Sequence, residues 1–175
     1  GTAIGDNPKL TTRGIAEGRD PLRVVVDSRL RLPMESAVFH IYSPAATLIA
    51  TTGDAPRDRI DLVRATGAEV IVLKADSDSR VCLEALWDAL GARNIQHLLV
   101  EGGATLNQAV LEASLVQRMT VILCPLLLGG GDAPGIFSGR GIGALSDAVR
   151  LRDLRAQPCG PDLIIEGEVE PCSPV

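Results

Sequence analysis

Residues 99–109, LVEGGATLNQA, place a carboxylate and two glycines between an apolar run and a stretch that favours helix. The amino end of a helix presents free N–H groups and the positive end of the helix dipole, and both suit a phosphate. Glycine lets the backbone approach a ligand closely because it has no Cβ. The pair Gly102-Gly103 therefore predicts a phosphate-binding turn, with Glu101 facing the same crevice at the end of a strand. An ordinary tight connection with Glu101 in solvent explains the same residues equally well.

The first thirteen residues, GTAIGDNPKLTTR, carry a second candidate anion site. Turn-forming residues 6–8 are followed by lysine, threonine and arginine side chains within residues 9–13. In a chain whose net charge is −5, such a cluster beside a rigid turn suits a phosphate or another anion. A solvated basic loop is the alternative interpretation, and the cluster alone does not exclude it.

Residues 139–144, GRGIGA, formally fit the glycine pattern of dinucleotide-binding turns. That fingerprint requires a strand before it and a helix after it. Phe137-Ser138 precede the pattern in place of a strand, and only a short helical segment can follow. We therefore predict a surface loop here.

Around these candidates, apolar β-type runs alternate with helical periodicity, which predicts an α/β fold with a mostly parallel sheet flanked by helices. Residues 147–157 and 161–170 are two alternating runs around a Pro/Gly turn, so an antiparallel pair is expected at the sheet edge. The other predicted strands are 22–27, 38–42 (a weaker candidate), 47–52, 69–73, 97–101 and 119–125, and the predicted helices are 55–66, 79–93 and 104–115.

Composition excludes several classes of protein. A length of 175 residues predicts one domain with its own core. The negative net charge and an aromatic content of 2% argue against a nucleic-acid partner. We expect no membrane segment and no signal peptide, hence a cytoplasmic protein. The four cysteines, at positions 82, 124, 159 and 172, form no CxxC pair, and His40 and His97 have structural roles in this interpretation, so no metal site is predicted.

Four motifs, in order and spacing, give the chain a family resemblance. They are GTxxxDNPxLTxR at 1–13, RVVVDS at 23–28, VEGGxTL at 100–106 and PLLLGG at 125–130. Together they resemble the pyrimidine reductase of riboflavin biosynthesis, which is found alone or fused to a deaminase. The resemblance covers essentially the whole chain and implies a dihydrofolate-reductase-like fold. It implies NADPH-dependent reduction of a ribosylaminopyrimidine phosphate to the ribitylamino product.

The resemblance also implies roles for individual residues. Arg13 is expected to hold the sugar phosphate, and Glu101, the candidate catalytic residue, to meet polar groups of the substrate near the point of hydride transfer. Ser28, Arg29 and the strand end Thr51-Thr52 are weaker candidates for the 2′-phosphate of NADPH. Substrate contacts are implied at Asn7, Leu10, Arg13 and Glu101, and NADPH contacts at Thr2, Asp6, Ser28, Gly103, Ala104, Thr105 and Leu106.

Family members carry about fifty residues before the position that matches Gly1, so the resemblance implies that this single reductase domain lacks the first central strand and helix, which would leave a sheet edge open. The zinc signature of the deaminase is absent from the sequence, so any deaminase is expected outside this chain. The family implies a homodimer, for which the C-terminal strands and PLLLGGG offer interface material. Two alternatives stay open: reduction of another pterin or pyrimidine on the same fold, and a non-catalytic nucleotide-binding domain.

Overall fold

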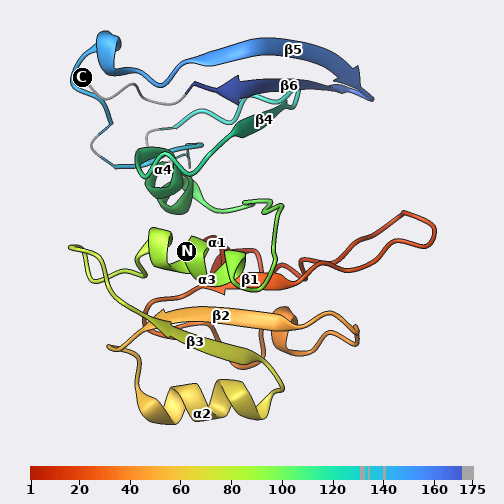
Figure 1. Ribbon diagram of the computed structural model, residues 1–175. Helices are drawn as coiled ribbons and strands as arrows, with labels where there is room; N and C mark the ends of the chain where they lie inside the picture. Colours follow the sequence, from red (N-terminus) through yellow and green to blue (C-terminus); the bar gives the residue numbers. More distant parts are fainter. Residues whose placement is uncertain (131–132, 134, 140, 171–175) are drawn as a thin grey trace. The chain divides into compact units, whose positions relative to one another are not determined.

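The computed structural model describes residues 1–130, 133, 135–139 and 141–170. The chain divides into two compact units, Gly1–Leu99 (unit 1) and Val100–Val175 (unit 2). Unit 1 carries a parallel sheet, and unit 2 carries an antiparallel one (Figure 1). The α/β fold class predicted from the sequence is confirmed, with its strands distributed over two three-stranded sheets.

The sheet of unit 1 is built around a fully buried central strand. Its strands β1 (Arg23–Val26), β2 (Thr47–Thr52) and β3 (Glu69–Leu73) lie in the order β1-β2-β3, and both pairings are parallel (Figure 1). Every residue of β2 is buried, as expected for a parallel strand covered on both faces. The predicted strands 47–52 and 69–73 are confirmed to the residue.

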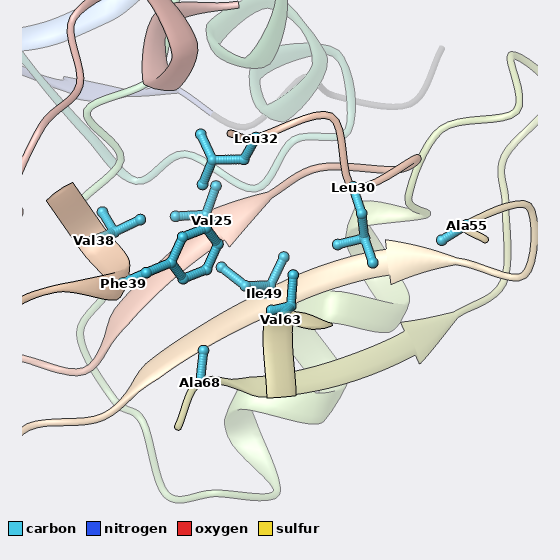
Figure 2. Packing of buried hydrophobic residues seen from close by; sticks show 9 residues of the cluster. All are labelled: Val25, Leu30, Leu32, Val38, Phe39, Ile49, Ala55, Val63 and Ala68. Carbon is cyan, nitrogen blue, oxygen red and sulfur yellow. The ribbon is translucent and has the colours of Figure 1, made fainter. Parts of the chain in front are cut away.

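One face of this sheet packs against α2 (Arg57–Ala65) and the chain that follows β1. Val25 and Ile49, which are register partners, point to this face, and Val63 of α2 packs on them. Figure 2 shows the Phe39 ring beside Val25 and Ile49. Alternation along the strands therefore places this cluster on one side of the sheet.

The opposite face packs against α3 (Leu83–Gly91). Leu48 and Ala50 of β2 meet Leu86 and Leu90, which lie one turn apart on the helix. Leu48, Leu86 and Leu90 are each at most 3% exposed. The helix predicted within residues 79–93, with apolar side chains on one face, is thus confirmed.

The helices of unit 1 have different limits from those predicted. The helix expected at 55–66 runs from Arg57 and ends before Gly67, whose φ of +88° forms the predicted glycine stop. The helix expected to begin at residue 79 begins at Leu83, because residues 75 and 81 form an isolated antiparallel bridge first.

Unit 2 consists of helix α4 (Ala104–Glu112) and the antiparallel sheet. Strands β4 (Arg118–Leu123), β5 (Leu151–Cys159) and β6 (Asp162–Val169) lie in the order β4-β6-β5. The predicted antiparallel pairing of the last two runs is confirmed, and Gly160, with φ of +59°, forms the turn between them.

Two predicted strands do not form. Residues 97–101 are irregular, and Leu98 and Leu99 are 39% and 81% exposed. β-type composition alone does not make a strand when no neighbouring strand completes the hydrogen-bond ladder, and among the described residues this segment has none. The weaker candidate at 38–42 was also wrong: Ala37–Phe39 form a 3₁₀ helix, η1, because Val38 and Phe39 are both buried and do not alternate.

The remaining expectations concern loops and cysteines. Residues 139 and 141–144 of the glycine pattern lie in a loop, and the described part that follows them holds only η2 (Leu145–Asp147) before β5. Arg140 and Cys172 lie outside the described residues. Cys82, Cys124 and Cys159 are free thiols. No helix among the described residues is long and apolar enough to cross a membrane.

The α3 face of the sheet predicts a large loss of stability on truncation. Leu86→Ala removes a side chain that is 1% exposed, so we expect the free energy of unfolding to fall by roughly 2–5 kcal/mol. Urea unfolding followed by the fluorescence of Trp87, the single tryptophan, measures this. The control Leu62→Ala, at a side chain 50% exposed on α2, should lower it by far less. Equal losses would contradict the described core.

Candidate functional site

The carboxyl end of β1 is fixed by Ser28. Its Oγ accepts the Val81 N–H at 3.0 Å, which ties the approach to α3 to the strand end. Its carbonyl oxygen accepts hydrogen bonds from the hydroxyls of Thr51 and Thr52, at 3.0 and 2.9 Å. Ser28 is half-buried, and its hydroxyl can still donate a hydrogen bond to a ligand.

Burial separates the weaker candidates for the 2′-phosphate. Thr51 and Thr52 are 0% exposed and their hydroxyls donate to the Ser28 carbonyl, which makes them weaker candidates for the 2′-phosphate than the residues after β1. Arg29 is exposed. Ser28 and Arg29 are therefore the stronger candidates at this strand end.

The loop after β1 is held by contacts that sequence reasoning missed. Asp27, 7% exposed, accepts the Leu32 N–H at its Oδ2 (2.7 Å), and its Oδ1 lies 3.9 Å from Arg31 Nε. Arg59 of α2 donates to the carbonyls of Leu30 and Leu32, at 2.7 to 3.2 Å. The signal in the sequence is Asp27 itself, an acidic residue directly after strand β1.

The N-terminal segment contains two non-glycine residues with left-handed backbone. Asn7 has φ of +44° and Leu10 has φ of +53°, values that cost free energy for a side chain such as leucine. Asn7 Oδ1 accepts the Ala37 N–H at 2.7 Å, and Leu10 packs against the core cluster of Figure 2. The segment after α1 (Thr2–Gly5) is thereby held against unit 1.

Of the charged residues in this segment, Asp6 and Arg13 are both exposed. The structure gives no hydrogen bond or ion pair from Arg13 to any described residue. Its guanidinium therefore keeps all its donors for a ligand, as a phosphate-binding arginine requires. The neighbouring Thr12, in contrast, donates from both its backbone and its hydroxyl within the loop.

The predicted phosphate turn in unit 2 has the geometry of an open helix end. Gly103 is the N-cap of α4, in extended conformation, and no side chain caps the helix. A Cβ on Gly102 would lie 2.9 Å from Leu106 Cδ2 and 3.0 Å from its Cβ, so only glycine fits this position without movement. The amides at the start of α4 thus face an anion without competition from a side-chain cap.

The first turn of α4 also carries a contact that the sequence did not reveal. Ser138 N–H donates to the Ala104 carbonyl at 3.2 Å, and the Ser138 and Thr105 hydroxyls are 3.2 Å apart. Asn107 donates to the Ile136 carbonyl at 3.1 Å. The loop 136–138 therefore braces the helix end that is predicted to bind the cofactor.

Glu101 is exposed and belongs to the irregular segment before α4. Its expected place at the end of a strand was wrong, because residues 97–101 form no ladder. A cavity of about 200 Å³ lies instead at the amino ends of β1 and β2, around Arg23 and Thr47, and no predicted site residue lines it. Within the described ranges, no group of three or more His, Cys, Asp or Glu side chains could hold a metal.

Comparison with models of protein families shows which family the chain belongs to. The family model of the RibD C-terminal domain matches residues 1–165. The chain belongs to the RibD C-terminal domain family. The resemblance drawn from the four sequence motifs is therefore confirmed.

Several curated relatives resemble this RibD C-terminal domain over nearly its whole length. The 2,5-diamino-6-ribosylamino-4(3H)-pyrimidinone 5′-phosphate reductase of Methanothermobacter thermautotrophicus is 37% identical over 97% of this chain and 76% of the relative. The reductase of the same name from Aquifex aeolicus is 35% identical over 96% of the chain and 73% of the relative. The riboflavin biosynthesis protein RibD of Actinobacillus pleuropneumoniae is 34% identical, and the chain spans 43% of its length.

Solved structures agree on the fold. Acinetobacter baumannii RibD matches 97% of this RibD C-terminal domain with a TM-score of 0.78 and 22% identity, and the match covers 45% of that protein. The riboflavin biosynthesis reductase Rib7 of Saccharomyces cerevisiae gives a TM-score of 0.72 at 16% identity, over 97% of the chain and 72% of Rib7. The expected dihydrofolate-reductase-like architecture is confirmed by these matches.

The close approach of Gly102 to Leu106 predicts a cofactor-binding defect in one variant. Gly102→Ala must displace the Leu106 side chain, and we expect the Kd for NADPH to rise by roughly tenfold, about 1.4 kcal/mol. Isothermal titration calorimetry measures the change. Gly91→Ala is the matched control, because nothing lies within 4 Å of its added Cβ. An unchanged Kd in Gly102→Ala would show that this turn does not bind NADPH.

Proposed function

We propose that this chain catalyses the pyrimidine reductase step of riboflavin biosynthesis with NADPH. The substrate is a 5-amino-6-(5-phosphoribosylamino)pyrimidine, in the uracil or the 2,5-diaminopyrimidinone form, and the product carries a ribitylamino group. The observation that carries the proposal is the 37% identity to a reductase with this substrate in its name, over 97% of the chain. We place this reaction in the cytoplasm, as expected from the sequence.

The residues of both units are compatible with NADPH. A reductase of this pathway needs a nicotinamide cofactor, and bound NADPH supplies the hydride. In unit 2, residues 103–106 offer an uncapped helix end for a phosphate group. In unit 1, Thr2 and Asp6 lie on the N-terminal segment, and Ser28 with Arg29 lies at the end of β1. Arg29 gives a positive charge that would favour NADPH over NADH.

The substrate contacts are assigned by the chemistry of each side chain. In unit 1, Arg13 is an exposed cation without a partner among the described residues, which suits the sugar phosphate, and Leu10 offers an apolar contact. Asn7 has its Oδ1 bound to Ala37 N–H, so its amide NH₂ is the part left for substrate. In unit 2, Glu101 presents an exposed carboxylate, which can accept hydrogen bonds from the amino groups of the pyrimidine.

The reaction itself needs little covalent chemistry from the protein. The ribosylamine opens to an imine, hydride adds to C1′ and a proton adds to the nitrogen, which gives the ribitylamine. The protein must hold the imine carbon against the hydride donor and exclude water, and alignment of this kind is a large source of rate enhancement. Fixing the phosphate through Arg13 restricts the flexible open chain while hydride adds.

We also propose that the chain forms a homodimer through unit 2. Large apolar side chains are exposed on β4 and after it: Ile122 is 60%, Leu126 73% and Leu127 103% exposed. Exposed apolar patches on a small domain mark interaction surfaces. A second copy is the partner that an isologous interface of this kind requires.

Replacing Arg13 tests the function. Arg13→Ala should raise the KM for the phosphorylated substrate by roughly 10- to 100-fold, the loss expected for charged hydrogen bonds to phosphate, and should leave the Kd for NADPH nearly unchanged. Steady-state kinetics and calorimetry measure the two constants. Arg64→Ala, at an exposed arginine of α2, is the control. Equal losses in KM and Kd would contradict the assigned roles.

Replacing Leu127 tests the dimer. Leu127→Asp places a charge in the proposed interface, so the sedimentation coefficient should change from that of a dimer to that of a monomer. Leu62→Asp, on the exposed side of α2, should leave the dimer intact. A wild-type chain that sediments as a monomer at every concentration would contradict the proposal.

A further inference from the structure

Arg13 belongs to the loop of residues 12–20, which is closed by two hydrogen bonds from Thr12. Thr12 N–H donates to Asp20 Oδ1 at 2.8 Å, and Thr12 Oγ1 donates to the Arg19 carbonyl, also at 2.8 Å. The residue before Arg13 is thereby held at both its backbone and its side chain. Arg13 itself stays exposed at the edge of this closed loop.

Asp20 is the residue on which this closure depends. The pKa of Asp20 lies below its ordinary value. The causes, in order of effect, are a hydrogen bond from the Ser43 side chain, a hydrogen bond from the Thr12 amide and the charge of the Arg23 guanidinium. The carboxylate is therefore charged at neutral pH. It is 19% exposed, and its Oδ2 lies 3.9 Å from Arg23 Nη1.

Arg23 in turn anchors Asp20 to the sheet. Its side chain is 3% exposed, and its Nε donates to Thr47 Oγ1 at 3.0 Å while its Nη2 donates to the Ala45 carbonyl. Thr47 is the first residue of β2. Arg23 Nη1 is buried without a hydrogen-bond partner among the described residues, so the Asp20 carboxylate is the charge that faces it.

The loop also packs closely on the Thr12 side chain. A Cβ on Gly18 would lie 2.7 Å from Thr12 Cγ2, a distance at which one of the two must move. Gly18 does not have a positive φ, so the restriction here is steric alone. Thr12 is thus held by Asp20 through its amide and by Gly18 through its methyl group.

We propose that Asp20 is a positioning residue for substrate phosphate binding: through Thr12 it holds Arg13 in place, and Arg23 anchors it to β1 and β2. The inference rests on the proposed function, because it assigns Arg13 to the phosphate of the substrate. A purely structural role for Asp20 would change the free energy of unfolding without changing recognition of the phosphate.

The first measurement is limited proteolysis, which does not depend on activity. Trypsin cleavage after Arg13, followed by mass spectrometry under native conditions, should be roughly tenfold faster in Asp20→Ala, because a loop with one charged hydrogen bond fewer opens more often. The residues on either side of this bond are unchanged in the variant. Asp20→Asn keeps an oxygen for the Thr12 amide and should restore most of the protection. Asp61→Ala, which removes an exposed carboxylate from α2, should leave the rate as in wild type.

The second measurement is the KM for the phosphorylated substrate and for its dephosphorylated form. Asp20→Ala should raise the first KM roughly fivefold to tenfold with kcat nearly unchanged, and should leave the second KM alone, because only the phosphate contact is disturbed. In an Arg13→Ala background, Asp20→Ala should add little. Gly18→Ala, which displaces Thr12 without altering charge, should change KM in the same direction, and serves if Asp20→Ala does not fold.

The outcomes separate the two proposals. Wild-type activity with equal cleavage and equal KM in Asp20→Ala and Asp61→Ala would overturn the role of Asp20 and leave the function standing. No reduction of the pyrimidine by wild type would overturn the function, while the cleavage rates still test whether Asp20 closes the loop. Equal increases in KM for both forms of the substrate would also overturn the link to the phosphate.

Discussion

Strand β2 must be shielded from water on both of its faces, and unit 1 is arranged around that requirement. All six of its residues are buried, and alternate side chains enter different clusters: Ile49 joins one, Leu48 and Ala50 the other. Each cluster needs its own cover, which α2 and the chain after β1 provide on one face and α3 on the other. Burial of this kind is the dominant favourable term in folding, so the positions of the strand ends follow from it.

The two ends of the same sheet then carry different polar constraints. At the carboxyl end, the hydroxyls of Thr51 and Thr52 donate to the Ser28 carbonyl, and Ser28 Oγ accepts the N–H of Val81, just before α3. At the amino end, Thr47 holds the buried Arg23, which faces Asp20. Buried polar groups of this kind fix a structure because leaving them unpaired is costly. The loops of unit 1 that carry proposed contacts are thus tied to the strand that the core protects.

The parts of the fold that follow from local pattern could be predicted from the sequence. Residues 47–52 and 69–73 match their strands, and Gly67 ends α2 as expected. Residues 97–101 could not be judged correctly, because strand formation depends on a neighbour that composition does not reveal. At the site, the glycine turn before α4 was foreseen, whereas the burial of Thr51-Thr52 needed the three-dimensional packing. Asp20 was missed because no local pattern links it to Thr12, at the other end of its loop, or to Ser43.

The central claim is that this RibD C-terminal domain reduces a phosphoribosylaminopyrimidine with NADPH. The most direct test incubates the chain with that substrate and with NADPH deuterated at the transferable C4 position, and analyses the product by mass spectrometry and NMR. We expect a ribitylamino product that carries one deuterium at C1′, and an equal amount of oxidised cofactor. Unchanged substrate and cofactor, or a product without deuterium at C1′, would contradict it.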